Sequence, residues 1–341
     1  MMNKTLTGFE NETCVKIEKS AISHILMSAY IFNFIFGLIF NVLTIFPILK
    51  QVKQQNVLGV FLLCLSISDL LFIATMPLWI HYYRNDHKWE LNVMSCNVIG
   101  FFYYSNMYIS IYLLCCISVD RCLVVCYPLR FKTHRTSLYA WLQCGIIYVG
   151  VAVLHIIVLD NDNLTDAHDE KKDTCYETYP MEAPVAKFNL VRVVLGFLLP
   201  LLVLAVSYWR VMATVGQSPG MSAQAQRKVR LLCYGVIIIF SICFAPYHIL
   251  LLIRSVVFLN SNDHSSKGSY CQFEQGIHFY FSCTLALSGL NSVVDPVLYV
   301  LVTNGVKDKL KLCCGGCGWK PTEGSAVLSQ IGEKHVRSSL I

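Results

Sequence analysis

Two aspartates lie inside long apolar stretches of the sequence, where a charged group is costly. Asp69 falls within the stretch 57–83 and Asp295 within the stretch 277–302. Ionisable residues at membrane depth are rare and mark proton or ion pathways. Because two neighbouring carboxylates cannot both ionise easily, such a pair is expected to take up a proton when its surroundings change. The alternative is a proton shared within a purely structural network.

Histidines form a second set of titratable residues, since their charge changes near neutral pH. Seven are expected on or near the extracellular side: His24, His81, His87, His155, His168, His264 and His278. Protonation of an outer cluster would make these side chains repel one another and shift the protein between two packings. Scattered, solvated loop histidines are the alternative.

The elements that carry these residues follow from the composition. Of 341 residues, 55% are hydrophobic and only 14% are charged, whereas soluble domains keep about a quarter of their residues charged. Seven stretches are apolar enough to span a bilayer, which takes about 20 residues per helix. They are 21–49, 57–83, 98–119, 138–159, 193–209, 231–253 and 277–302. Backbone polar groups in lipid must be satisfied within the segment, so the predicted fold class is an all-α membrane protein with seven transmembrane helices.

Loop charges predict the orientation, because Lys and Arg near helix ends stay in the cytoplasm. The connections after the first, third and fifth stretches are basic, and the connection after the fourth is acidic. We therefore expect an extracellular N-terminus (1–20), a seven-helix domain (21–303) and a cytoplasmic segment (304–341) that begins with a short amphipathic helix. The net charge of +6 follows from this pattern and does not indicate nucleic-acid binding.

Modification motifs agree with this orientation. Glycosylation sequons begin at Asn3, Asn11 and Asn163, which all fall on the predicted outer side. Cysteines that follow a basic juxtamembrane segment favour palmitoylation, and here they are Cys313, Cys314 and Cys317. A zinc site is the alternative for these cysteines, but it needs four ligands and no fourth is evident nearby.

Short motifs, in the order and spacing of the seven stretches, resemble those of rhodopsin-like G-protein-coupled receptors over nearly the whole chain. The residues that carry the resemblance are Asn41, Leu65–Asp69, Asp120–Cys122, Trp141, Pro200, Tyr208, Cys243–Pro246 and Asp295–Tyr299. The resemblance implies a plasma-membrane receptor that carries an extracellular signal to a heterotrimeric G protein. Serines in the segment 304–341 offer phosphorylation sites for arrestin binding.

The resemblance also implies an allosteric sodium ion, which would be the only cofactor. The matching pocket consists of Asp69, Asn106, Ser110, Asn291 and Asp295. Its oxygen atoms suit a small, hard cation. Most family members have Asn at the position of Asp295.

Four cysteines lie in the oxidising outer compartment and suggest two disulfides: Cys14, Cys96, Cys175 and Cys271. The family pattern pairs Cys96 with Cys175, which leaves Cys14 for Cys271.

Roles in activation are implied in the same way. In the family, Asp120 restrains Arg121 at rest, and Arg121 reaches the G protein on activation. Tyr208 and Tyr299 would stabilise the active state. Pro246 would kink helix six, because proline lacks an N–H and clashes with the preceding turn, and the opening of that helix is a rigid-body transition.

Further motifs resemble the proton-sensing and lysolipid-responsive group: Met76–Ile80, Cys116–Arg121 and Phe244–His248. The segments Asn56–Leu58, Leu62–Leu65 and Arg84–Trp89 look like the member that responds to oxidised fatty acids and lysophospholipids. Proton-sensing relatives carry a third acid three positions after Trp141, where this chain has Cys144. Weaker acid sensing is therefore expected.

A ligand site is expected between the helices at the outer mouth of the bundle. Arg192 and Arg254 lie there, and a guanidinium group binds a carboxylate or phosphate through two parallel hydrogen bonds. We hypothesise that they bind an anionic lipid headgroup. The lipid tail would lie among Phe101, Tyr104, Tyr108, Phe244, Tyr247 and His248. The alternatives are an ion pair of Arg254 with the acidic outer loop and ordinary core packing of the aromatic residues.

Other functions have less support. A primarily proton-sensing receptor and a nucleotide or peptide receptor are the alternatives within the class. An ion-coupled transporter is the alternative outside it, although we find none of the internal repeats that many transporters contain. The sequence has no zincin, P-loop or nucleophile-elbow motif, so we do not expect an enzyme.

Overall fold

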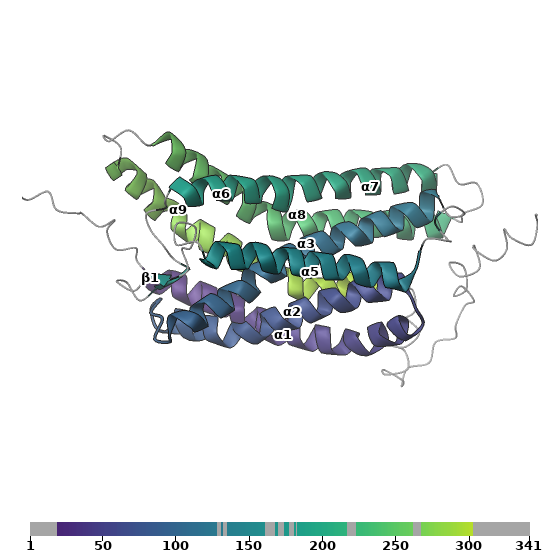
Figure 1. The fold of residues 1–341 in the computed structure, drawn as a ribbon, viewed down its shortest axis with the longest axis horizontal. Coiled ribbons are helices and arrows are strands. Elements are labelled where there is room, and N and C mark those ends of the chain that lie inside the picture. Colours follow the sequence, from purple (N-terminus) through teal and green to yellow (C-terminus); the bar gives the residue numbers. More distant parts are fainter. Residues whose placement is uncertain are drawn as a thin grey trace, which may run out of the picture.

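The computed structural model describes residues 19–127, 131, 135–160, 168–169, 174–176, 181, 183–216, 223–261 and 267–302. Within these residues, seven helical spans are long and apolar enough to cross a membrane. Long helices lie side by side along the long axis of the molecule (Figure 1). The predicted seven-helix bundle is confirmed.

The first four spans are single helices: α1 (Lys19–Lys53), α2 (Val57–Arg84), α3 (Val93–Cys126) and α5 (Ser137–Asp160). The fifth span consists of α6 (Ala183–Val193), the π-helix η1 (Val194–Leu198) and α7 (Leu199–Gly216). The sixth is α8 (Ala223–Asn260), and the seventh consists of α9 (Lys267–Ser288) and α10 (Asn291–Val302).

Two short strands lie between α5 and α6 in the sequence. The strands β1 (His168–Asp169) and β2 (Thr174–Cys175) are antiparallel, with His168 opposite Cys175. They lie at the end of the bundle where α6 and α9 begin (Figure 1). We call this end the hairpin end and the opposite one the Asp120 end.

The fifth span begins ten residues earlier than the predicted stretch 193–209. Its first helix, α6, contains the polar residues Lys187, Asn189 and Arg192. They lower the hydropathy of this segment, so the predicted apolar stretch began only at residue 193. The π-helix follows at Val194–Leu198, just before Pro200. Proline has no N–H to donate to the carbonyl four residues earlier, and such a loss favours a local change in helix register.

A disulfide anchors the hairpin to the bundle. Cys96 in α3 is bonded to Cys175 in β2, with 5.8 Å between their Cα atoms, as the family resemblance implied. Next to it, a Cβ atom at Gly100 would overlap the ring of Tyr176. The absence of a side chain at this position therefore lets the hairpin approach α3 closely.

Several predicted sites lie outside the described residues and stay predictions: Asn3, Cys14, Asn11, Asn163, His264, Cys313, Cys314 and Cys317. The side chains of His168, Cys271 and Tyr299 are also outside the description. The second disulfide, glycosylation and palmitoylation therefore remain predictions from the sequence.

Candidate functional site

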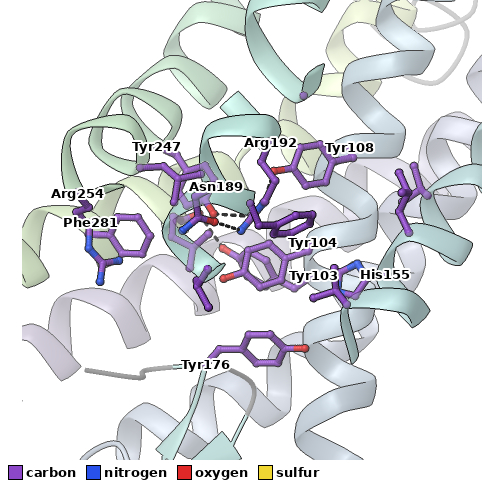
Figure 2. Close-up of a pocket in the computed structure, with 18 of the residues that line it drawn as sticks. Tyr103, Tyr104, Tyr108, His155, Tyr176, Asn189, Arg192, Tyr247, Arg254 and Phe281 are labelled. Carbon is purple, nitrogen blue, oxygen red and sulfur yellow. Dashed lines mark hydrogen bonds between the residues drawn. The ribbon is translucent and has the colours of Figure 1, made fainter. Parts of the chain in front are cut away.

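A cavity of about 260 Å³ lies between the helices near the hairpin end. Residues from α1, α2, α3, α5, α6, η1, α8 and α9 line it, together with Cys175 in β2 and Tyr176 directly after it. Figure 2 shows Tyr104 and Arg192 in the middle of this group, with His155 and Arg254 on opposite sides. Burial raises the pKa of the Tyr176 phenol, so this residue presents a neutral hydroxyl.

Arg192 is the central polar residue of the cavity. Its Nε donates to the Tyr108 hydroxyl at 2.9 Å, its Nη1 to Asn189 Oδ1 at 3.0 Å and its Nη2 to the Tyr247 hydroxyl at 2.9 Å. The guanidinium carbon also lies 5.1 Å from the centroid of the Tyr104 ring. All these partners are neutral, and no acid pairs with Arg192 in the part of the chain that the structure describes.

Gly196 in the π-helix allows this arrangement. A Cβ atom at this position would overlap the ring of Tyr108. The backbone of η1 therefore approaches α3 closely enough for Tyr108 to reach Arg192. The sequence offered a weak signal for this contact, because a glycine lies four residues before a helix proline.

Arg254, at the edge of the cavity, has an acidic partner. Its Nε and Nη2 donate to the two carboxylate oxygens of Glu274 at 3.1 Å and 2.6 Å. Its guanidinium lies over the Phe281 ring, 4.2 Å from the centroid. Sequence reasoning offered the acidic outer loop as the partner, whereas the structure places the partner in α9. The charge of Arg254 is therefore already balanced, unlike that of Arg192.

The predicted lipid-binding aromatic residues divide into two sets. Tyr104, Tyr108 and Tyr247 line the cavity. Phe244 and His248 do not line it, which corrects their assignment as direct ligand contacts. Phe244 is fully buried in the core between α3, α7 and α8, and His248 stacks on Phe197 with 4.9 Å between ring centroids.

Phe101 also lies outside the lining. Sequence reasoning missed Asn189, Tyr176 and Glu274, because they lie in segments without a family motif.

The described histidines occupy different surroundings. His24 is exposed, and His81 lies 3.6 Å from Glu90. His87 is fully buried beside the rings of Tyr82 and Tyr83, and His278 is buried in α9. His87 and His278 are therefore buried side chains and not solvated ones.

His155 lines the cavity. It packs against the rings of Phe101 and Tyr104, with centroids 5.2 Å and 6.1 Å away. This histidine belongs to the cavity wall rather than to a surface cluster.

Asp69 and Asp295 line a second, much smaller cavity of about 10 Å³ together with Asn41 and Ser66. This is about the space that one water molecule or one small ion requires. Both carboxylates are buried, and Asn106 Nδ2 donates to Asp69 Oδ1 at 2.9 Å. The two acids are therefore neighbours, as the proton-sharing hypothesis requires.

The other predicted sodium ligands are also buried, namely Ser110 and Asn291. Among the described side chains, the second oxygen of Asp69 and the Ser110 hydroxyl have no hydrogen-bond partner. Buried oxygen atoms of this type fit a small, hard cation or a water molecule. The chemistry of these oxygen atoms suits the sodium ion that the family resemblance implies, whereas Asn106, Ser110 and Asn291 do not line the 10 Å³ cavity.

Cys144, at the position of the third acid of proton-sensing relatives, is buried in an apolar cluster formed by α2, α3 and α5. Its thiol contacts the thiol of Cys64. No carboxylate is therefore supplied from this position.

At the Asp120 end, one carboxylate binds two arginines. Arg121 Nη2 lies 2.8 Å from Asp120 Oδ2. Arg135, just before α5, places Nε 2.8 Å from Oδ1 and Nη2 3.1 Å from Oδ2. Sequence reasoning found the first arginine and missed the second, because Arg135 is fifteen residues away and belongs to no motif.

Two further residues with an expected role in activation lie on α7 and α8, namely Tyr208 and Pro246. Tyr208 is buried in the cluster formed by α3, α7 and α8. Pro246 lies inside α8. The signal-transmitting residues expected from the family are thus placed on helices that pack together.

The family model described as 7 transmembrane receptor (rhodopsin family) matches residues 40–299. Relatives include the probable G-protein coupled receptor 132 of Homo sapiens, which is 35% identical over 92% of this chain and 79% of the relative. The G-protein coupled receptor 68 of Bos taurus is 33% identical over 84% of this chain and 76% of its own length. The cysteinyl leukotriene receptor 2 of Homo sapiens is 32% identical, with coverages of 83% and 79%.

The chain therefore belongs to the rhodopsin family of seven-transmembrane receptors and is a multi-pass, G-protein-coupled receptor of the plasma membrane. Within the family it falls in the group that includes G-protein coupled receptors 132 and 68. The class and the group predicted from the motifs are confirmed.

The Arg254–Glu274 pair generates a prediction about stability. Arg254→Ala leaves a carboxylate buried without its bidentate partner, and breaking a buried pair in this way costs about 3–5 kcal/mol. Adding Glu274→Gln removes that charge and should restore most of the loss. Thermal unfolding of the purified receptor measures both effects, with Arg210→Ala, at an exposed hydrogen bond to Tyr127, as the control. Equal losses in the single and double variants would contradict this account.

The pairing of Asp120 with both Arg121 and Arg135 leads to a prediction about activity. Arg135 competes with Arg121 for the Asp120 carboxylate. In the Arg135→Ala variant, Asp120 should therefore bind Arg121 more tightly. We expect basal G-protein activation to fall about two- to fivefold, which corresponds to about 0.5–1 kcal/mol for a partly exposed pair. A nucleotide-exchange assay at matched receptor density measures the change, with the exposed Arg227 changed to Ala as the control. An increase in basal activity would show that Arg135 restrains the receptor instead.

Proposed function

We propose that the agonist is a single-chain anionic lipid, a lysophospholipid or an oxidised fatty acid, whose headgroup binds Arg192. The observation that carries this proposal is a cation in an aromatic cavity whose hydrogen-bond partners are all neutral. A buried charge is costly unless an opposite charge accompanies it. A carboxylate or phosphate that enters the cavity supplies that charge.

The rest of the cavity suits the remainder of such a lipid. Its walls consist mainly of tyrosine, leucine and valine side chains, and a second arginine, Arg254, lies at its edge. The cysteinyl leukotriene receptor 2, a relative named for a lipid ligand, supports the same ligand class. A large basic peptide would meet a positive rather than a negative site.

The signal would travel along α8. Tyr247 hydrogen-bonds Arg192 at the cavity, and Phe244, one turn further along the same helix, packs in the core that contains Tyr208. An anion that binds Arg192 competes with the Tyr247 hydroxyl and changes the packing of α8. Movement of α8 would then release Arg121 from Asp120 toward the G protein, and arrestin would bind the same activated receptor.

This proposal places the hairpin end outside the cell, with an extracellular N-terminus. The basic connections at the Asp120 end, together with the Cys96–Cys175 disulfide at the hairpin end, support this orientation. The cavity then opens toward the extracellular side, where a lipid signal is present.

Modulation by protons is the second candidate function, favoured by the shared cavity of Asp69 and Asp295. The loss of the third acid at Cys144 argues for modulation rather than strong acid sensing. A sodium ion held by Asp69, Asn106, Ser110, Asn291 and Asp295 would supply positive charge to the same acids. Its displacement by a proton couples the two effects.

Arg192→Gln tests the lipid proposal. This substitution removes the positive charge and the parallel N–H donors of the guanidinium group but keeps a polar side chain. We expect the half-maximal concentration for the active lysophospholipid or oxidised fatty acid to rise about 100-fold, while Arg192→Lys gives a smaller rise. G-protein activation in cells measures both, with the exposed Lys187→Gln on the same helix as the matched control. If Arg192→Gln and Lys187→Gln behave alike, Arg192 is not the headgroup site.

Asp295→Asn tests proton modulation. Asn cannot take up a proton, so any increase of activity on acidification between about pH 8 and pH 6 should disappear in this variant. The same cell assay without added lipid measures the pH profile, with wild type alongside. An unchanged profile would exclude the pair as the proton site and leave the lipid proposal standing.

A further inference from the structure

Two cysteine side chains are in contact at the Asp120 end of the bundle. Cys122 and Cys126 lie one turn apart on α3, and their Sγ atoms are 3.9 Å from each other. Both thiols are free in the structure. Cys126 is the last residue of α3, so the pair lies at the end of the span and not in its apolar middle. Neither the large cavity nor the Asp69–Asp295 cavity includes these thiols.

The spacing of the two thiols does not suit a disulfide. Residues four apart on a helix have Cβ atoms about 5–6 Å apart, whereas a disulfide requires about 3.5–4.5 Å between its Cβ atoms. Forming that bond would distort the last turn of α3. The proposed orientation puts this end of the bundle in the cytoplasm, where thiols stay reduced. The pair is therefore a stable dithiol.

The same spacing suits one metal ion bound by both sulfurs. With metal–sulfur bonds of about 2.3 Å, as in zinc sites, two sulfurs on one ion lie about 3.8 Å apart at a tetrahedral angle and about 4.6 Å apart in a linear arrangement. The observed 3.9 Å falls within this range. An ion therefore joins the two thiols after a small rotation of either side chain, and the helix stays intact.

The small number of ligands selects the kind of ion. Among the described residues, no group of three or more His, Cys, Asp or Glu side chains is placed to hold a metal. Zinc takes about four ligands and calcium about six or more. Copper(I) is a soft ion that prefers thiolates, and two of them satisfy it. The reducing conditions that keep the thiols free also keep copper in this monovalent state.

The groups around the thiols favour the charge of such a complex. When two thiols bind one copper(I) ion, both release their protons, so the bis-thiolate complex carries one negative charge. Arg210 in α7 lies within electrostatic range of Cys122, and it donates a hydrogen bond to the neutral Tyr127 hydroxyl. The Thr214 hydroxyl lies 3.2 Å from Cys126 Sγ and can donate to the thiolate. Outer hydrogen bonds of this kind orient metal ligands and strengthen metal binding.

We propose that Cys122 and Cys126 form a copper(I) site at the cytoplasmic end of α3, with Thr214 of α7 as a supporting hydrogen-bond donor. Cys126 is partly exposed, so an ion exchanges there without crossing the bilayer. Because Cys122 directly follows Arg121, a bound ion fixes the turn of α3 that carries this arginine. The site does not depend on the lipid agonist and goes beyond the proposed receptor function.

Titration of the purified full-length receptor with copper(I) tests the site. Bicinchoninate forms a coloured copper(I) complex, and the receptor should withdraw copper(I) from it. Cys122→Ser and Cys126→Ser should each withdraw about one equivalent less than the parent receptor. Cys116→Ser, at a partly buried free cysteine on the same helix, is the matched control and should lose nothing. Every version carries serine in place of the three cysteines after the bundle, namely Cys313, Cys314 and Cys317.

Two further measurements keep both sulfurs in place, so they do not depend on how the serine variants fold. Bound copper(I) should slow the alkylation of Cys126 by iodoacetamide about tenfold, because only a free thiolate reacts. Peptide mass spectrometry measures this protection. Thr214→Val removes the supporting donor, so the dissociation constant for copper(I) should rise about tenfold, whereas Thr214→Ser should restore it.

The outcomes decide between a copper(I) site and an unused thiol pair. Loss of one equivalent in both serine variants, together with protection of Cys126, supports the site. The proposal is wrong if the two serine variants bind as much copper(I) as Cys116→Ser, or if copper(I) leaves the alkylation of Cys126 unchanged. Equal protection of Cys126 by zinc(II) at the same free concentration would overturn the selectivity for a soft monovalent ion.

Discussion

The positive charge of Arg192, inside an apolar helix bundle, is the constraint that shapes the hairpin half of this receptor. A guanidinium group among hydrocarbon side chains is stable only if oxygen atoms surround it. Tyr108, Tyr247 and Asn189 supply those oxygens from three different elements, α3, α8 and α6. Gly196 lets the first of them approach. The cavity, the cluster of tyrosines and the close contact of η1 with α3 all follow from this charge.

The other buried charges of the receptor are balanced in a different way. Arg254 has Glu274, and Asp120 has both Arg121 and Arg135. Paired charges hold elements together, because separating them leaves a buried charge uncompensated. A charge with only neutral partners leaves room for an anion from outside. The proposed preference of the site for an anion rests on this contrast between Arg192 and Arg254.

Helix α8 joins the two ends of the molecule. Its hairpin half contributes Tyr247 and Arg254 to the cavity, and its middle contributes Phe240 and Phe244 to the core shared with α3 and α7. Protein cores are close-packed, so they change between discrete arrangements rather than deforming gradually. The proposed signal would pass through this core, from the partners of Tyr247 to Tyr208. The small cavity lined by Asp69 and Asp295 is the proposed place where one proton or one ion would bias the same equilibrium.

The sequence by itself determined the seven spans and the receptor class, and through the family resemblance it also indicated the Cys96–Cys175 bond. These features depend on local hydrophobicity and on short motifs, and both can be recognised in the linear sequence. It also singled out Asp69 and Asp295, because a carboxylate in an apolar stretch is conspicuous.

Only the tertiary structure decided which groups meet. The members of each pair, Arg254 and Glu274, Arg135 and Asp120, and Arg192 and Tyr108, come from different segments of the chain, and their contacts depend on how the helices are placed and rotated. The same rotation turned Phe244 and His248 away from the cavity, and tertiary packing buried His87 and His278. Nearly uniform hydrophobicity around a transmembrane helix carries little information about its rotation, because lipid and protein interior are both apolar. The charge balance of the site was therefore decided by packing.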